Sequence, residues 1–155
     1  MKNTISRNLD YEKSLGNSLK EEKTALITGG AKRLGRAISK DLARSGYNVI
    51  IHYNNSEDDA FSLREELLEL GNDVHLIQAD LLNEGETISL FDKCKNLTDK
   101  PVNLLINNAS IFEYDTVKTA TRENWDRHFE SNLRAPFVLT QVFAAQAPAT
   151  GLSLI

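Results

Sequence analysis

The chain has 155 residues, 41% hydrophobic and 26% charged, which is enough for one domain with a hydrophobic core. Its formal net charge of −4 argues against a general nucleic-acid binder, and no apolar run approaches the roughly 20 residues that cross a bilayer. Nucleic acid and membrane are therefore not expected as partners. The single cysteine, Cys94, excludes an intrachain disulfide and fits a reducing, cytoplasmic location.

Residues 1–22 are polar and lack the apolar block of a secretory signal. They predict a flexible N-terminal extension, or alternatively a short regulatory or oligomer-contacting arm. From residue 24 onward, strand-like and helix-like segments alternate. Strands are predicted at 24–27, 48–53, 73–79 and 102–108, and helices at 34–43, 57–70, 84–97 and 121–147. Thr121 is a candidate cap for the last helix, and Pro136 is expected to bend or interrupt it.

This alternation of apolar strands with helices predicts an α/β fold, a doubly wound, Rossmann-like parallel sheet with helices on both faces and strand order 3-2-1-4. Residues 151–155 resemble the opening of a fifth strand. We therefore expect a domain over 23–155 that is truncated near strand five and leaves the fourth strand with an unpaired apolar edge. The carboxyl ends of the strands carry Gly29, Tyr53, Asp80 and the run Asn107 to Ser110, and ligands of such sheets bind at that edge.

The stretch from Thr28 to Gly35 lies between the first strand and the first helix, where a glycine-rich turn binds phosphate. Its glycines, Gly29, Gly30 and Gly35, depart from the G-x-G-x-x-G spacing. They match Thr-Gly-x-x-x-Gly-x-Gly, with Arg33 in place of the middle glycine. A dinucleotide site follows as a hypothesis, in which Arg33 is a phosphate contact or a solvated turn residue.

Three further motifs follow in order, and with the turn they resemble the short-chain dehydrogenase/reductase family from residue 23 to about 150. Asn107-Asn108-Ala109-Ser110 is similar to the Asn-Asn-Ala-Gly motif of that family, and Asp80-Leu81 to its adenine-contacting Asp. Asn132 matches its helix-four asparagine, a catalytic residue. Cofactor binding by Gly29, Leu34, Gly35 and these strand-end residues is what the resemblance implies. Asp80 could alternatively be a turn acid, and Asn107 and Asn108 could simply satisfy a strand-end turn.

A narrower resemblance is to pteridine reductases and the related dihydromonapterin and dihydrofolate reductases. It rests on Arg33, on the sequence from His52 to Ser56, and on Ser110 followed by an aromatic, Phe112. The resemblance implies that Arg33 and Phe112 contact the substrate, with the Phe112 ring stacked on a pterin. Packing of Phe112 within its loop is the alternative.

The cofactor can be argued from the residues after the second strand. An NAD site places an acid there for the ribose hydroxyl, roughly 20 residues beyond the glycine turn. This chain instead has His52, Tyr53, Asn54, Asn55 and Ser56, and the first acid is Glu57. A 2′-phosphate is therefore tolerated, and NADP(H) is preferred to NAD(H).

The resemblance also implies a catalytic Ser, Tyr and Lys, which would follow the fifth strand. Tyr114 and Lys118 have the Tyr-x-x-x-Lys spacing, but they precede that strand, and Ser153 falls too early in it. The chain is therefore expected to be one part of an NADP(H)-dependent reductase acting on a pterin, a dihydrofolate-type or a carbonyl substrate, and to be inactive alone. The alternatives are a nucleotide-binding module without chemistry and a short-chain reductase of another carbonyl substrate.

Three aromatic or apolar residues of the last helix, Trp125, Phe129 and Leu133, recur at helical spacing and indicate core or subunit contact. Full-length members of the resembled family imply a homo-oligomer. His75 and His128 lack the spacing of a metal site and are expected to be structural.

Overall fold

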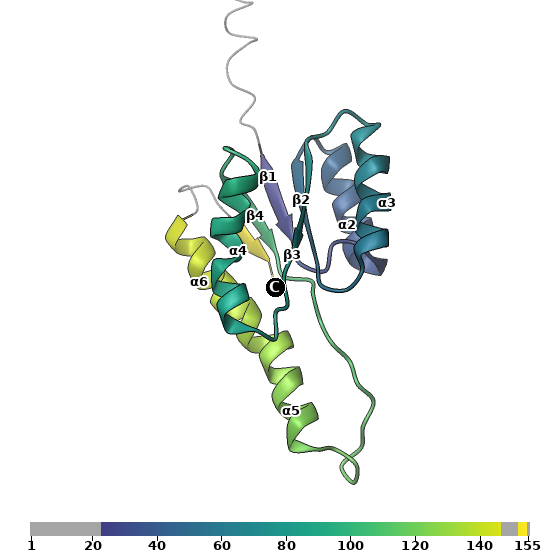
Figure 1. The fold of residues 1–155 in the computed structure, drawn as a ribbon, viewed down its shortest axis with the longest axis vertical. Helices are drawn as coiled ribbons and strands as arrows, with labels where there is room; N and C mark the ends of the chain where they lie inside the picture. Colours follow the sequence, from purple (N-terminus) through teal and green to yellow (C-terminus); the bar gives the residue numbers. More distant parts are fainter. Residues whose placement is uncertain (1–22, 147–151, 155) are drawn as a thin grey trace, which may run out of the picture.

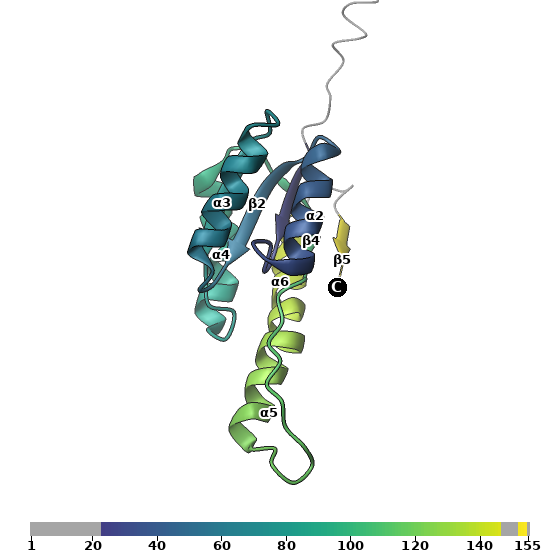
Figure 2. The same ribbon diagram turned by 90° about the vertical axis from the view of Figure 1, so that its right-hand side faces the viewer.

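The computed structural model describes residues 23–146 and 152–154, and shows a parallel sheet between two layers of helices (Figures 1 and 2). The sheet order is β3-β2-β1-β4-β5. The strands are β1 (Thr24–Ile27), β2 (Asn48–Tyr53), β3 (Val74–Gln78), β4 (Val102–Ile106) and β5 (Leu152–Leu154). The predicted Rossmann-like α/β fold and the order 3-2-1-4 are therefore confirmed.

The helices are α2 (Arg33–Arg44), α3 (Glu57–Leu68), α4 (Glu84–Leu97), α5 (Arg122–Phe129), the π-helix η1 (Glu130–Arg134) and α6 (Ala135–Gln146). Figure 1 shows α2 and α3 on one face of the sheet and α4 and α6 on the other. The segment that contains α5 extends away from the sheet, beyond the carboxyl ends of the strands.

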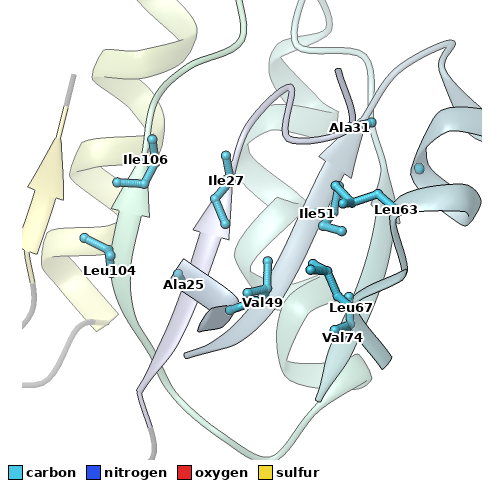
Figure 3. Close-up of a cluster of buried hydrophobic side chains, with 12 residues drawn as sticks. Ala25, Ile27, Ala31, Val49, Ile51, Leu63, Leu67, Val74, Leu104 and Ile106 are labelled. Carbon is cyan, nitrogen blue, oxygen red and sulfur yellow. The ribbon is translucent and has the colours of Figure 1, made fainter. Parts of the chain in front are cut away.

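The core follows from strands that are buried on both faces. Along β1, Ala25 and Ile27 join the cluster under α2 and α3, while Leu26 joins the cluster under α4 and α6. The first cluster continues across the sheet through neighbouring strands to Ile51 and Ile106 (Figure 3). Each such aliphatic side chain contributes about 2 kcal/mol on burial, so the sheet is a rigid base for the residues at its edge.

The strand register brings the site-forming segments to one edge. Ile27 pairs with Ile51 on one side and with Ile106 on the other. The residues that follow these three positions are therefore level with one another. The glycine turn, the end of β2 and the asparagines after β4 consequently lie side by side.

One expectation about the sheet is wrong, namely that the fourth strand has an unpaired edge. The short strand β5 pairs with β4 in parallel, with Leu152, Ser153 and Leu154 opposite residues 104–106. The edge of β4 is therefore covered along residues 104–106.

The last predicted helix, 121–147, is interrupted as expected near Pro136. Thr121 caps α5, because its Oγ1 accepts a hydrogen bond from the N–H of Asn124 at 3.1 Å. The chain then widens into η1, where the N–H of Ala135 donates to the Glu130 carbonyl, five residues back. Pro136 has no N–H to continue the regular ladder, which fits a wide turn just before α6. Residue 147 and the expected N-terminal extension, 1–22, lie outside the described residues.

Candidate cofactor site

A cleft of about 540 Å³ lies at the carboxyl ends of β1 to β4. Four segments that are far apart in the sequence line it: the glycine turn, the end of β2, the turn after β3 and the start of the loop after β4. Its residues are Gly29, Ala31 to Gly35, His52 to Ser56, Asp80 to Leu82, Asn108 to Ile111 and Ser131. Of the predicted site residues, Asn107, Phe112 and Asn132 do not line it.

The glycine turn needs its glycines at two positions. Gly29 has φ +60°, in the left-handed region that favours glycine. A Cβ on Gly35 would overlap the Gly29 carbonyl oxygen and lie 2.7 Å from Asn108 Nδ2. The turn therefore packs backbone against backbone, and a pyrophosphate can approach the N-terminus of α2, where first-turn N–H groups have no intrahelical partner.

Arg33, the first residue of α2, also has a positive φ of +48°. A non-glycine residue there costs about 1 kcal/mol relative to glycine. Arg33 nevertheless lines the cleft and brings a positively charged residue to it. This backbone strain lies at the position where the motif has its middle glycine.

The end of β2 supplies uncharged polar groups. Asn54 Nδ2 donates to Asp80 Oδ1 at 3.2 Å, and the Ser56 side chain makes no capping hydrogen bond to α3. Burial, followed by the charge of Glu57, raises the pKa of Tyr53, so its phenol stays protonated. As predicted, the wall from Tyr53 to Ser56 carries no carboxylate.

Lys32 lines the same cleft and is absent from the residues expected from the sequence. It precedes α2, and its ammonium lies 2.8 Å from Asp59 Oδ2 on α3. A basic residue adjoining Arg33 at the start of a phosphate-binding helix was the signal available in the sequence.

Asp80 acts in this structure as a turn acid. Its Oδ1 accepts from the N–H of Leu82 at 3.0 Å, and its own N–H donates to Glu86 Oε2 at 2.8 Å. The side chain still borders the cleft beside Leu81, which is 6% exposed.

The two consecutive asparagines after β4 have different positions. Asn108 Nδ2 donates to the carbonyls of Thr28 and Gly29, at 2.9 and 3.1 Å. Thr28 Oγ1 in turn accepts from the N–H groups of Asn108 and Ala109, at 2.9 and 3.0 Å. Asn107 instead donates to Thr140 Oγ1 on α6 at 3.2 Å. Thr28 and Asn108 therefore lock the glycine turn to β4, while Asn107 fixes α6.

Asn132, in the π-helix, holds the loop that leaves the cleft. Its Oδ1 accepts from the N–H of Ile111 and its Nδ2 donates to the Ile111 carbonyl, both at 2.9 Å. Beyond that clamp, Phe112 is 83% exposed, so packing of its ring within the loop is excluded. Tyr114 is 82% exposed and lies outside any helix, unlike a catalytic Tyr-x-x-x-Lys pair.

His52 is almost fully buried at this edge, 2% exposed. Its Nδ1 accepts from the N–H of Gly29 at 3.1 Å, and its Nε2 lies 3.1 Å from the carbonyl oxygen of Ala79. Burial lowers its pKa to about 4, so the ring is neutral at physiological pH.

Several expectations concern residues outside the cleft. Cys94 is buried, which raises the pKa of its thiol to about 12 and makes it unreactive. His75 pairs with Asp73 at 3.0 Å, and His128 Nε2 accepts from the N–H of Glu113 at 3.1 Å, which are structural contacts.

Trp125, Phe129 and Leu133 are between 45% and 61% exposed, so the core interpretation of these residues is wrong. Across residues 23–146 and 152–154, no cluster of three metal-binding side chains and no helix long and apolar enough to cross a membrane occurs.

Comparison with known proteins agrees with this geometry. A family model described as short chain dehydrogenase matches residues 23–151. Elsinochrome reductase 1 of Elsinoe fawcettii is 30% identical over 128 residues, which cover 83% of this chain and 48% of the relative. The chain spans about half the length of the curated relatives it matches.

Solved structures are similar as well. FolM alternative dihydrofolate reductase 1 from Brucella suis, in complex with NADP, is 34% identical with a TM-score of 0.78 and matches over 84% of this chain and 55% of that one. The landomycin C-6 ketoreductase LanV, with bound NADP and rabelomycin, is 30% identical with a TM-score of 0.79, over 84% and 56%. With the family model covering nearly all of the described residues, this chain belongs to the short chain dehydrogenase family.

Proposed function

We propose that the chain is the NADP(H)-binding part of a reductase. The observation that carries this proposal is the single cleft in which the glycine turn, the carboxylate-free end of β2 and the Asn108–Ser110 segment meet. The similar structures of FolM and LanV, which contain NADP, support it. Reduced nicotinamide, when bound, would supply the hydride.

In this proposal, each segment of the cleft contacts a different part of the cofactor. The N-terminus of α2 receives the pyrophosphate, because the missing side chain of Gly35 leaves the backbone open there. Asp80 and Leu81 border the adenine, and Ala109 and Ser110 border the nicotinamide end. These roles fit the sheet order, in which the ends of β3 and β4 lie on opposite sides of the glycine turn that follows β1.

The preference for NADP(H) over NAD(H) rests on charge. A 2′-phosphate at the end of β2 would meet Lys32 and Arg33, with hydrogen-bond donors on Asn54, Asn55 and Ser56. Lys32 must exchange its partner Asp59 for the phosphate. A charge-assisted contact of this kind favours the phosphorylated cofactor.

Substitution of Lys32 tests the preference. Lys32→Gln is expected to weaken NADPH binding by about ten-fold and leave NADH binding unchanged. Lys95→Gln on α4, whose ammonium pairs with Asp92 on the same helix, is the control. Equal weakening of both cofactors would contradict the assignment of Lys32 to the 2′-phosphate.

The substrate that the site suits best is a flat pterin or dihydrofolate-type ring. Phe112 leaves an aromatic face free near the cleft, and Arg33 offers a cation. Similarity to FolM supports this choice, whereas LanV and elsinochrome reductase favour other carbonyl substrates. Stacking on an aromatic ring contributes about 1 kcal/mol, so Phe112→Ala should raise the KM for a pterin several-fold in a full-length protein.

Asn132 is the one member of the expected catalytic set that the described residues contain, and its side-chain amide is occupied by the Ile111 backbone. We therefore propose that Asn132 shapes the loop between β4 and α5. We also propose that the chain alone does not turn over, because no other member of that set is found among the described residues. A reducing compartment such as the cytoplasm stays a prediction from the single buried cysteine.

A homo-oligomer is also proposed, on the exposed apolar stripe of Trp125, Phe129, Leu133 and Phe137. Trp125 and Phe129 stack with their ring centroids 4.6 Å apart, and Phe129, Leu133 and Phe137 line a surface groove. Such a stripe on one side of α5, η1 and α6 is typical of a contact between subunits.

The decisive experiment is titration of the 155-residue chain with NADPH and NADH, followed by a turnover assay with dihydrobiopterin, dihydrofolate and a generic carbonyl compound. Tighter binding of NADPH without turnover is expected. Turnover would overturn the expected inactivity, and absence of binding would overturn the cofactor assignment. Binding without turnover also fits a regulatory module. Pterin binding that occurs only in the presence of NADPH would exclude that alternative.

A further inference from the structure

His52 joins two parts of the cofactor cleft that no covalent segment joins directly. It is the penultimate residue of β2, and its ring lies between the glycine turn after β1 and the residue that follows β3. One ring nitrogen faces Gly29 and the other faces Ala79, each at 3.1 Å. The side chain is 2% exposed, so contact with a cofactor would be made by its neighbours rather than by the ring.

The hydrogen bonds define the tautomer. The Gly29 N–H is a donor, so Nδ1 must carry a lone pair, and the Ala79 carbonyl is an acceptor, so Nε2 must carry the proton. Only a neutral imidazole protonated at Nε2 satisfies both partners. Burial lowers the pKa to about 4 and keeps that form throughout the physiological range.

The bond to Gly29 acts at the most constrained point of the turn. Gly29 has φ +60°, and a Cβ built there would lie 3.0 Å from the Ala109 Cα. Its carbonyl accepts from Asn108 Nδ2, while its N–H is held by His52. The two peptide groups that flank the Gly29 Cα are thus each held by a side chain, and together they direct the chain toward α2.

The neighbouring positions of β2 show which kind of residue would be expected at position 52 if its side chain only filled space. Ile50 and Ile51 are aliphatic and fully buried. His52 is nearly as buried as they are but carries two polar atoms, one of which meets the partly buried Gly29 N–H and the other the carbonyl of the buried Ala79.

We propose that His52 is a positioning residue, whose neutral imidazole holds the Gly29 peptide through Nδ1 and thereby presets the phosphate-binding turn. This inference rests on the proposed NADP(H) site. The Nε2–H to Ala79 contact serves as an anchor that orients the ring. The two contacts have separate roles, which isosteric substitutions can separate.

The test uses two amides that each keep one half of the ring's hydrogen bonding. Asn places Oδ1 near the Nδ1 position and retains the acceptor for Gly29, whereas Gln places Nε2–H near the ring Nε2 and retains the donor for Ala79. NADPH affinity is expected to fall by about ten-fold in His52→Gln and by less than about three-fold in His52→Asn. Thermal unfolding of both variants, and hydrogen exchange at the Gly29 amide, are measured alongside.

The exchange measurement does not require cofactor. The Gly29 amide is expected to exchange faster in His52→Gln than in wild type and to remain protected in His52→Asn. If wild type fails to bind NADPH, the proposed function fails, and the Gly29 exchange rates alone still decide the role of His52.

The remaining outcomes are as definite. Unchanged affinity in His52→Gln, a larger loss in His52→Asn, or losses that follow only the fall in thermal stability would each overturn the inference. Equal exchange rates of the Gly29 amide in the two variants would also overturn the inference. Only His52→Asn keeps an acceptor for that amide, so the two rates can be equal only if the hydrogen bond to Nδ1 does not protect it.

Discussion

The edge of the sheet and the arm that projects from it are held together in different ways. At the edge, Thr28, His52 and Asn108 are tied into a network of hydrogen bonds that joins β1, β2, β3 and β4. In the arm, the eight residues of α5 include none that is buried, and Trp125 and Phe129 are exposed. The edge ties these three polar side chains to neighbouring backbone groups, whereas the arm leaves apolar side chains exposed.

This difference shows which contacts fix the cofactor cleft and which fix the loop between β4 and α5. Most of the cofactor cleft is formed by residues 23–110, and Ile111 and Ser131 complete its lining. The loop between β4 and α5 is fixed mainly by Asn132 and by the contacts of Glu113 with Arg127 and His128. Substitutions in the edge should therefore change cofactor affinity or stability, and those in the arm should change association.

The largest effect is expected from Gly35→Ala. The new methyl group would collide with the Gly29 carbonyl and Asn108 Nδ2, so the turn must open and NADPH affinity should fall by about 100-fold or more. Titration of NADPH fluorescence measures the change. Gly85→Ala in α4, where the nearest atom is 3.3 Å away, is the matched control and should bind as wild type does. Retained affinity in Gly35→Ala would show that the turn is not the phosphate site.

Acid should destabilise the edge through His52. Its pKa is near 6.5 in the unfolded chain and about 4 in the fold, so the unfolded state takes up the proton first as the pH falls. The fall in the free energy of unfolding that His52 causes is negligible above about pH 6.5 and should reach about 3 kcal/mol near pH 4. Urea unfolding of wild type and of His52→Gln across that range measures it. A parallel pH dependence of the two proteins would contradict the buried neutral ring.

A smaller loss is expected from Thr28→Val, which keeps the shape of the side chain and removes its oxygen. The N–H groups of Asn108 and Ala109 would lose their acceptor, and the free energy of unfolding should fall by about 2 kcal/mol. Thr28→Ser, which keeps the hydroxyl, is the control for urea unfolding. If valine were tolerated as well as serine, the link between β1 and β4 would carry little of the stability.

The smallest effect on folding is expected in the arm. Phe129→Asp should lower the free energy of unfolding by about 1 kcal/mol, because it removes the stack on Trp125 from a side chain that is already 45% exposed. It should nevertheless abolish self-association, measured by sedimentation equilibrium. Glu123→Gln, at the start of the same helix, is the control. Association that survives Phe129→Asp would remove the support for a subunit contact on this stripe.

Much of the fold was predictable from the sequence because its strands are short apolar runs between clear turn signals. The bounds of β2 and α4, for example, agree with the expectation to the residue. The pairing of β5 with β4 was not predictable, since a few apolar residues do not reveal which edge they join. The π-helix was anticipated only as an interruption, because Pro136 removes a donor without dictating how the preceding turn relaxes.

The site was predictable at the level of segments and less so at the level of atoms. Asn107 and Asn108 are identical in kind, and only the direction of the chain after β4 places one on α6 and the other at the glycine turn. The exposure of Trp125 could not be read from helical spacing, which is the same for a buried and for an interfacial stripe. The partner of Lys32 depends on how α3 packs beside α2.

The left-handed backbone of Arg33 costs the fold stability, so the arginine side chain must contribute at least as much free energy to ligand binding for the residue to be favoured. Glycine at this position would relieve about 1 kcal/mol, so a chain under selection for stability alone would lose the arginine. A mutant library sorted for resistance to heat should therefore become enriched in Arg33→Gly, while the same library sorted for ligand capture should retain arginine. Opposite enrichment in the two sorted libraries would show that thermal stability and ligand binding favour different residues at position 33.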